Sequence, residues 1–174
     1  MRLFDWQQQV RKLQAGTASA RDEQYFLQQV NSFWNKTPYL EDQAHWASPD
    51  YWATPVETKG SNGGDCEDYV FGKYFTLKEL GIPVRKLRIT YVKATDTKEP
   101  HMVLAYYPQP EADPLILDNL IGAILPASKR TDLQPVYSFN HDDSWMSQGI
   151  VKRQPSELRL WRELLDKMVK ERQM

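Results

Sequence analysis

The stretch Ser61-Asn62-Gly63-Gly64-Asp65-Cys66-Glu67-Asp68-Tyr69 decides how the middle of this 174-residue chain folds. Its two consecutive glycines allow the backbone to bend and to approach other groups closely. Apolar residues then recur at helical spacing as far as Leu80, and Gly81 followed by Pro83 supplies a helix end. The sequence therefore predicts a helix over Cys66–Leu80 that begins with the only cysteine of the chain.

Three apolar segments follow this helix, and short polar turns separate them. We expect strands at Val84–Val92, His101–Tyr107 and Leu115–Leu117, because each is a short apolar segment bounded by turn residues. A helix followed by closely spaced strands is typical of an α+β fold with an antiparallel sheet. We therefore predict that the helix that carries Cys66 packs on such a sheet.

The rest of the chain is predicted to complete a single domain over residues 1–174. A helical part spans residues 1–36, and its clearest helix is the amphipathic stretch Asp22–Trp34. A C-terminal helix spans residues 155–174, with Ser156 as its cap.

The predicted core, residues 37–154, contains two segments without regular periodicity. Thr37–Gly64 is rich in proline and glycine, so we expect a loop there. Beyond Asp118, the segment Leu120–Leu125 is followed by a stretch to about Gln154 that we expect to be irregular.

The overall charge excludes some classes of function. The chain has 22 Lys and Arg residues against 23 Asp and Glu, which gives a net charge of -1. A nucleic-acid-binding protein needs a basic excess to neutralise phosphates, so we expect no nucleic-acid partner. No apolar run approaches the roughly 18 residues of a membrane span, so we expect no direct membrane insertion.

Cys66 is a candidate nucleophile because of its place at the start of a helix. Unpaired N–H groups and the helix dipole there favour a thiolate, and they can also stabilise an oxyanion. The acids Asp65, Glu67 and Asp68 act in the opposite direction, because their charge raises the thiol pKa. A cation or a protonated His101 would have to offset them. The alternative is that Cys66 is a small buried core residue.

His101 and Asp118 can complete a triad with Cys66. His101 opens a predicted strand after a polar turn, and Asp118 follows the next short strand. In such a triad the histidine takes the thiol proton, and the aspartate fixes the tautomer and orientation of the imidazole. His45 and His141 have no comparable context, so we expect structural or surface roles for them.

Three motifs together resemble a known family. Gly-Gly-Asp-Cys-Glu-Asp-Tyr at 63–69, Pro-His-Met-Val-Leu at 100–104 and Leu-Ile-Leu-Asp-Asn-Leu at 115–120 resemble the bacterial transglutaminase-like cysteine proteinases, with a close match to LapG-type periplasmic proteases. The resemblance implies a papain-like, transglutaminase-type core with Cys66, His101 and Asp118 as catalytic residues.

The resemblance also implies a biological role. LapG-type proteases cleave the N-terminal region of a large surface adhesin in the periplasm, next to a pair of alanines, which promotes biofilm dispersal. They depend on calcium, and an inner-membrane receptor for cyclic di-GMP sequesters them. We therefore expect a calcium-dependent periplasmic cysteine endopeptidase, with a signal peptide already removed from this chain.

Calcium suits the acids near the nucleophile, because Ca²⁺ prefers several oxygen ligands and would offset their charge. We predict a calcium site among Asp50, Asp65, Glu67 and Asp68. The alternative is that the last three only complement the helix dipole.

Two residues before Cys66, Trp52 and Asn62, are further candidates for a functional role. Trp52 either forms an exposed anchor for the receptor or folds back over the core. Asn62 is a candidate for assisting the oxyanion.

Two other functions remain open at this point. A transglutaminase or amidase would use the same acyl-transfer chemistry with a different acceptor. A calcium-dependent adaptor with a decayed active site would not carry out this acyl-transfer chemistry.

Overall fold

The computed structural model describes residues 2–15, 23–41, 51–146, 149–150 and 155–173. Within them, one hydrophobic core cluster extends from Leu13 near the N-terminus to Leu164 near the C-terminus. No described helix is long and apolar enough to cross a membrane.

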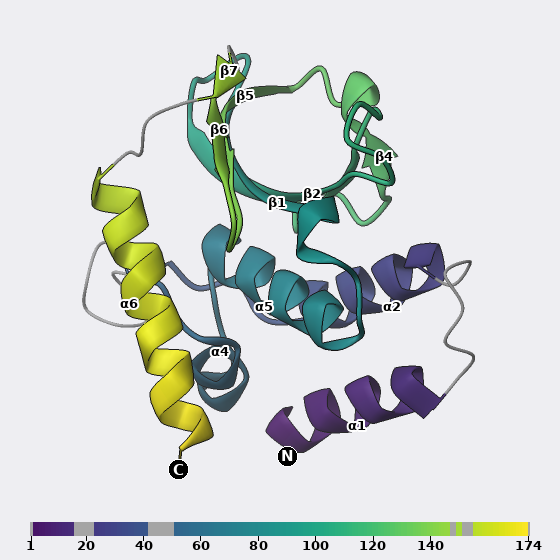
Figure 1. Cartoon of the computed structure of the whole chain (residues 1–174), viewed down its shortest axis with the longest axis vertical. Coiled ribbons are helices and arrows are strands. Elements are labelled where there is room, and N and C mark those ends of the chain that lie inside the picture. Colours follow the sequence, from purple (N-terminus) through teal and green to yellow (C-terminus); the bar gives the residue numbers. More distant parts are fainter. Residues whose placement is uncertain (1, 16–22, 42–50, 147–148, 151–154, 174) are drawn as a thin grey trace.

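The sheet contains seven described strands in the order β4-β3-β2-β1-β5-β6-β7. Every neighbouring pair is antiparallel. The sheet curves strongly when it is viewed along its edge (Figure 1). The strands are β1 (Leu87–Ala94), β2 (Pro100–Tyr106), β3 (Leu115–Leu117), β4 (Leu125–Pro126), β5 (Leu133–Phe139), β6 (Ser144–Met146) and β7 (Gly149–Ile150).

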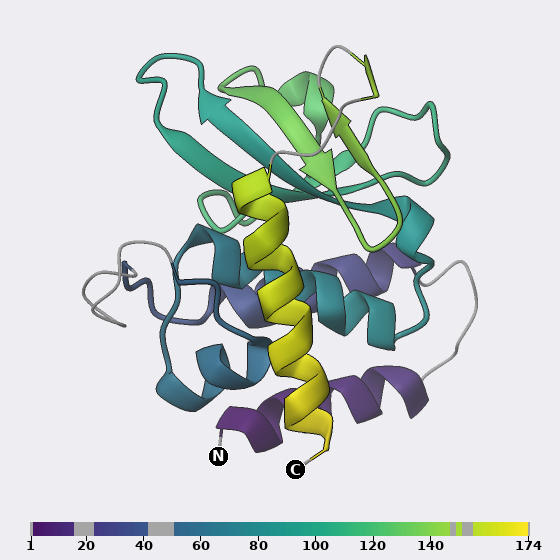
Figure 2. The ribbon, with the colours of Figure 1, turned by 60° about the vertical axis from the view of Figure 1, so that its left-hand side comes forward.

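The helices gather on one side of this sheet, as two views show (Figures 1 and 2). Helix α5 lies closest to β1 and β2, and the other helices lie around it. The described helices are α1 (Arg2–Ala15), α2 (Glu23–Asn35), α4 (Pro55–Ser61), α5 (Cys66–Glu79) and α6 (Pro155–Arg172).

Helix α5 is central because almost all of its surface is buried. Residues Asp68 to Leu77 are all buried, including apolar positions on every side of the helix. Gly72 allows the close approach of α2, since a Cβ atom there would lie 2.4 Å from the Trp34 indole. The indole Nε1–H also donates a hydrogen bond to Thr76 Oγ1 at 3.1 Å. These contacts hold the helix that begins with Cys66 between the sheet and α2.

The predicted α+β fold is confirmed. The helix begins at Cys66 and ends at Glu79, and Gly81 has the positive φ of 97° that favours glycine at a helix end. The strand expected at Val84 begins instead at Leu87, because Val84–Lys86 forms a 3₁₀ turn directly after Pro83.

Two segments were wrongly predicted to lack regular structure. Pro55–Ser61 forms α4, because Thr54 and Glu57 make a capping box and Pro55 suits a first helical turn. After Asp118 the chain forms β4 to β7, of which β4, β6 and β7 have only two or three residues and β5 has seven. β5 pairs with the distant strand β1, whereas β4, β6 and β7 each extend the sheet by pairing with the strand just before them in the chain.

Candidate active site

The start of α5 is held by hydrogen bonds to the carboxylate of Asp68. Its Oδ2 accepts the backbone N–H of Asp65 at 3.1 Å, and its Oδ1 accepts that of Ala53 at 3.1 Å. Asp65 is the N-cap residue, with extended backbone. Asp68 therefore fixes the turn that presents Cys66, which is a structural use of this acid.

The loop before α5 is held by backbone hydrogen bonds to the segment around Pro38 and Leu40. The Leu40 N–H donates to the Gly64 carbonyl at 2.8 Å, and the Gly64 N–H donates to the Pro38 carbonyl at 3.2 Å. A Cβ atom on Gly64 would lie 2.8 Å from the Cβ of Asp68. Glycine is therefore required here for the loop to reach the start of the helix.

Cys66 is half-buried and its environment is negative. Burial raises the thiol pKa, and the carboxylates of Glu67 and Asp65 raise it further, while a hydrogen bond from the Met102 backbone opposes them. The Sγ donates to Glu67 Oε2 at 3.4 Å. The helix start alone therefore does not produce a thiolate, and a nearby positive charge is needed.

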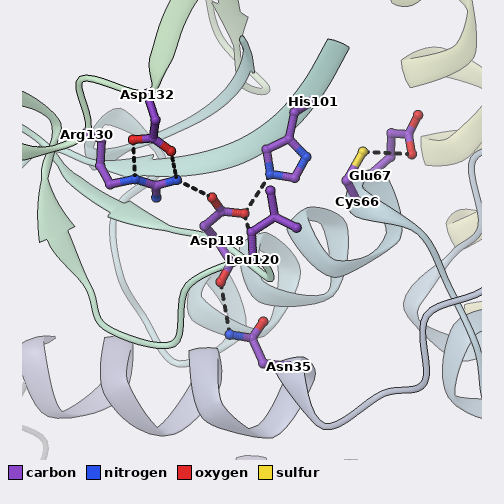
Figure 3. A network of polar contacts seen from close by, with 8 residues as sticks. All are labelled: Asn35, Cys66, Glu67, His101, Asp118, Leu120, Arg130 and Asp132. Atoms are coloured by element: carbon purple, nitrogen blue, oxygen red, sulfur yellow. Dashed lines mark hydrogen bonds and ion pairs between the residues drawn. The ribbon is translucent and has the colours of Figure 1, made fainter. Parts of the chain in front are cut away.

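His101 and Asp118 lie together beside Cys66. His101 is on β2, and Asp118 directly follows β3, the next strand of the sheet. The His101 Nε2–H donates to Asp118 Oδ1 at 2.6 Å. Figure 3 shows the imidazole between the carboxylate and the Cys66 sulfur, so its other nitrogen is on the side of the thiol. The three predicted triad residues therefore come together in one place.

Asp118 is buried and fully engaged in hydrogen bonds. Burial alone would raise its pKa, but hydrogen bonds and charge from His101, the Arg130 guanidinium and the Leu120 N–H outweigh it and lower the pKa to about 2. Arg130 Nη2 donates to Oδ2 at 2.8 Å, and Asn35 Nδ2 donates to the Asp118 backbone carbonyl at 3.0 Å. Asp118 is thus held as an anion in one orientation (Figure 3).

Arg130 is itself held by a second acid. Its Nε and Nη2 donate to the two carboxylate oxygens of Asp132 at 3.1 and 3.0 Å. The Arg130 side chain is buried, whereas Asp132 is exposed. Arg130 was not identified from the sequence, because it lies in a segment without periodicity and twelve residues beyond Asp118.

Lys73 is a second cation that sequence reasoning missed. It lies on α5 and is fully buried, and its Nζ has no hydrogen-bond partner among the described residues. Burial lowers its pKa to about 7, although the charge of Asp118 opposes that shift. The burial of Lys73 can be recognised only in the packed structure, because in the sequence it resembles an ordinary helical surface residue.

The four acids predicted to bind calcium have different surroundings. Asp65 and Glu67 flank Cys66, whereas both oxygens of Asp68 accept backbone N–H groups. Asp50 lies outside the described residues. Within the described part of the chain, no three His, Cys, Asp or Glu side chains are arranged to hold a metal ion.

The structure corrects the prediction that Trp52 is an exposed anchor. Trp52 is only 4% exposed, and it packs on Phe71 and Phe139, so the alternative that it folds over the core is confirmed. A partner cannot dock on this side chain without unpacking the core.

The other polar residues considered from the sequence are His141, Asn62 and His45. His141 Nδ1 forms a hydrogen bond with the Tyr74 hydroxyl at 2.6 Å, which is a structural contact away from the triad. Asn62 is exposed and caps the C-terminus of α4 with a left-handed backbone. His45 lies outside the described residues.

Comparison with known proteins is consistent with this arrangement. The chain is similar in structure to Legionella pneumophila LapG, with 42% sequence identity, a TM-score of 0.82, and coverage of 96% of this chain and 87% of that one. The calcium-bound form of the same protein gives 42% identity, a TM-score of 0.82, and coverage of 96% and 89%. The EGTA-treated form gives 41% identity, a TM-score of 0.83, and coverage of 96% and 88%. Comparison with curated proteins gave no match.

A family model provides the assignment. The model described as bacterial transglutaminase-like cysteine proteinase BTLCP matches residues 6–149, which include the nucleophile helix and the sheet from β1 to the start of β7. Together with the likeness to LapG over almost the whole chain, this match shows that the protein is a cysteine peptidase of the bacterial transglutaminase-like cysteine proteinase family.

Proposed function

We propose that this peptidase is an endopeptidase in which Cys66 is the nucleophile, His101 the general base and Asp118 the residue that orients the histidine. The observation that carries this proposal is the 2.6 Å hydrogen bond from His101 to Asp118, with the imidazole between that carboxylate and the thiol. An aspartate on one ring nitrogen leaves the other nitrogen available for the thiol proton.

The reaction follows from this order of groups. His101 takes the proton of Cys66, and the resulting imidazolium supplies the positive charge that the thiolate needs among its acidic neighbours. The thiolate attacks the peptide carbonyl, and N–H groups in the first turn of α5, which precede the helical hydrogen bonds, stabilise the oxyanion. His101 then protonates the leaving amine, and water hydrolyses the thioester to regenerate the thiol.

We propose the N-terminal region of a large surface adhesin as the substrate and the periplasm as the compartment. The support is the 42% identity to Legionella pneumophila LapG and the resemblance of the three motifs to LapG-type proteases. A cyclic di-GMP receptor of the inner membrane is the proposed regulatory partner. Its docking surface does not involve the buried side chain of Trp52.

A cleavage assay tests the protease function. The purified chain should cut an N-terminal adhesin fragment at one position, and mass spectrometry of the products should identify it. Cys66→Ala and His101→Ala should each abolish cleavage, whereas the exposed-surface control Arg159→Gln should not. Cleavage by Cys66→Ala would refute the proposal, and cross-linking to an added amine without backbone cleavage would favour a transglutaminase.

Calcium is proposed to bind beside the nucleophile, through Asp65 and Glu67. The donor chemistry fits, because hard carboxylate oxygens suit Ca²⁺, and these two acids produce a negative field that raises the pKa of the Cys66 thiol. When bound, a divalent cation would offset that field and hold the loop before α5. Asp68 would contribute mainly by fixing the turn, since its oxygens already accept N–H groups from Asp65 and Ala53.

Titration calorimetry and thermal unfolding test the calcium site without relying on activity. Calcium should bind and raise the melting temperature of the wild-type chain, and Glu67→Gln should weaken both effects. Glu111→Gln, which removes an exposed acid in a distant turn, is the matched control and should bind as the wild type does. Equal calcium binding by Glu67→Gln would remove Glu67 from the site.

A further inference from the structure

The sheet has a second apolar face, on the side away from the helices. Residues that pair across neighbouring strands share a face, and the next residue along each strand lies on the other face. Arg88 on β1 pairs with Ala105 on β2, which pairs with Ile116 on β3. Ala105 and Ile116 belong to a small buried cluster, whereas their neighbours Ile89 and Leu104 belong to the core that packs on α5. The second face lies inside the curve of the sheet (Figure 1).

This face holds a cavity of about 340 Å³. Its apolar lining includes Val92, Val103 and Ile116, which are at most 6% exposed. Two cationic side chains, Arg88 and Arg130, also line the cavity. Such a volume, with mainly apolar walls and a few polar groups, is typical of sites that bind small molecules.

The Arg88 guanidinium is held by aromatic rings and not by an acid. Its central carbon lies 4.0 Å from the centroid of the Tyr107 ring and 3.9 Å from that of the Trp145 ring. Such rings contact the flat face of a guanidinium, whereas the N–H groups point outward in its plane. Among the described residues, no carboxylate pairs with Arg88, and its buried Nε has no hydrogen-bond partner. The charge is therefore fixed in position without being neutralised by a described acid.

Arg130 brings a second guanidinium to the lining, but its charge is already paired. Its Nε and Nη2 donate to Asp132, and Nη2 also donates to Asp118. Its Nη1 is buried and lacks a hydrogen-bond partner in the described part of the chain. Arg88 is thus the anchor for an anion, and Arg130 can add one N–H donor. A ligand here would lie against the residue that orients Asp118, although none of the three triad residues lines the cavity.

We propose that this cavity binds a small amphipathic carboxylate. Its carboxylate accepts hydrogen bonds from Arg88, whose N–H donors form a fork that matches two carboxylate oxygens. Its apolar chain lies against Val92, Val103 and Ile116, where burial of apolar surface favours binding. This inference is independent of the proposed protease function, because the ligand is not a substrate and the thiol takes no part in binding it.

The charge of Arg88 decides the class of ligand. A purely apolar molecule would cover the guanidinium without pairing it, and burial of an unpaired charge is costly. A cationic ligand would be repelled by the same group. A carboxylate should therefore bind in preference to an alcohol with the same apolar chain.

The test uses the full chain and two probes of equal chain length, octanoate and 1-octanol. Titration calorimetry measures both affinities, and NMR spectra of isotope-labelled protein locate the site. Octanoate should bind at one site and shift the backbone amides of the lining residues Thr90 and Val103. 1-Octanol should bind about tenfold more weakly or less tightly still, because it lacks the charge-assisted hydrogen bonds to Arg88.

Variants of Arg88 test the anchor itself. Arg88→Met removes the charge and keeps an unbranched side chain, so it should weaken octanoate binding about tenfold or more and change 1-octanol binding little. Arg88→Lys keeps the charge without the fork and should have an intermediate affinity for octanoate. Arg159→Met is the matched control, because the Arg159 side chain is 66% exposed on α6, and it should bind both probes as the wild type does.

Three results would overturn the inference, namely no saturable binding of octanoate, equal affinity for octanoate and 1-octanol, or an unchanged octanoate affinity in Arg88→Met. Thermal unfolding checks that each variant is folded. If Arg88→Met does not fold, Arg88→Lys decides the question, and wild-type affinity for octanoate in that variant would contradict a carboxylate held by the fork. None of these measurements depends on peptide cleavage, so failure of the protease function would be seen separately.

Discussion

Arg130 and His101 bind opposite oxygens of the same buried carboxylate. Arg130 Nη2 donates to Asp118 Oδ2 at 2.8 Å, and His101 Nε2 donates to Oδ1 at 2.6 Å. Two donors on one carboxylate fix its rotation as well as its charge. We therefore regard Arg130 as a positioning residue that acts on His101 through Asp118.

Replacement of Arg130 should impair catalysis through the orientation of the triad. Arg130→Gln should lower kcat/KM by about tenfold or more, since removal of partners that orient functional groups has effects of this order. Arg130→Lys should restore only part of the loss, because a lysine keeps the charge without the two-pronged contact to Asp118 and Asp132. Steady-state kinetics would measure both variants.

The pH profile shows whether Arg130 acts through Asp118. Loss of the guanidinium should raise the pKa of Asp118, so the acid side of the kcat/KM profile should move to higher pH in Arg130→Gln. The exposed Arg159→Gln is the control. An unchanged profile with merely lower stability would mean that Arg130 has only a structural role.

Asp118 should also make stability depend on acid pH. Its pKa is lowered from 3.8 to about 2 in the folded state. A depressed carboxyl pKa contributes stability that is present above pH 3.8 and is lost as the pH falls towards 2. The contribution is about 2 kcal/mol by linkage.

Denaturant unfolding at pH 6 and pH 3 would measure the part of this contribution that is lost by pH 3. Asp118→Asn should show a smaller loss of unfolding free energy between the two pH values than the wild type. Asp96→Asn, which changes an exposed acid in a turn, should match the wild type. If Asp118→Asn lost as much unfolding free energy between the two pH values as the wild type does, the lowered pKa of Asp118 would be contradicted.

Lys73 should lower the stability of the fold at neutral pH. Its pKa falls from 10.5 to about 7 on folding because it is buried. Between these values the unfolded chain binds the extra proton, so the free energy of unfolding should rise with pH from about 7 to about 10.5.

Lys73→Met tests this expectation directly. Methionine fills a similar volume without a charge, so the variant should gain about 1–4 kcal/mol at pH 7, as is common when buried charges are replaced by apolar groups. The rise of stability between pH 7 and 10.5 should also flatten. Denaturant unfolding measures both, and a less stable Lys73→Met would show that the ammonium has a partner that stabilises the fold.

Gly72 should be essential for the packing of α2 on α5. A Cβ atom there would lie 2.4 Å from the Trp34 indole, which is fully buried and cannot move away. Gly72→Ala should therefore destabilise the fold by about 1–3 kcal/mol, in spite of the better helix propensity of alanine.

Gly60 supplies the matched control for this prediction. It lies in α4, and a Cβ atom there would meet nothing within 4 Å. Gly60→Ala should be neutral or stabilising by about 0.5–1 kcal/mol. Thermal unfolding would compare the two variants, and a stable Gly72→Ala would mean that Trp34 has room to shift.

Local pattern was sufficient for the longer helices and for the strands β1 to β3. The helix that begins at Cys66 and the strands around His101 and Leu117 were predicted from apolar spacing and turn residues, which act over a few positions. Strands β4, β6 and β7 were missed because they have only two or three residues each, and β5 was missed because it pairs with β1 from a distant part of the chain. Helix α4 was missed although its capping signal, Thr54 with Glu57, is present in the sequence.

The sequence by itself determined the class of chemistry. One cysteine after two glycines, a histidine at a strand start and an aspartate after the next strand predict a triad, because each residue type has its role by its own chemistry. Its acidic neighbours likewise predicted the charge crowding that raises the pKa of the Cys66 thiol.

Only the tertiary structure decided which other groups reach that site. Arg130 is brought to Asp118 by the turn between β4 and β5, and Lys73 by its place on the buried helix α5. Trp52 is taken into the core, where it packs on Phe71 and Phe139. Burial and long-range contact depend on how distant segments pack together. Apolar spacing specifies the elements, but the charges that surround the triad follow from their packing.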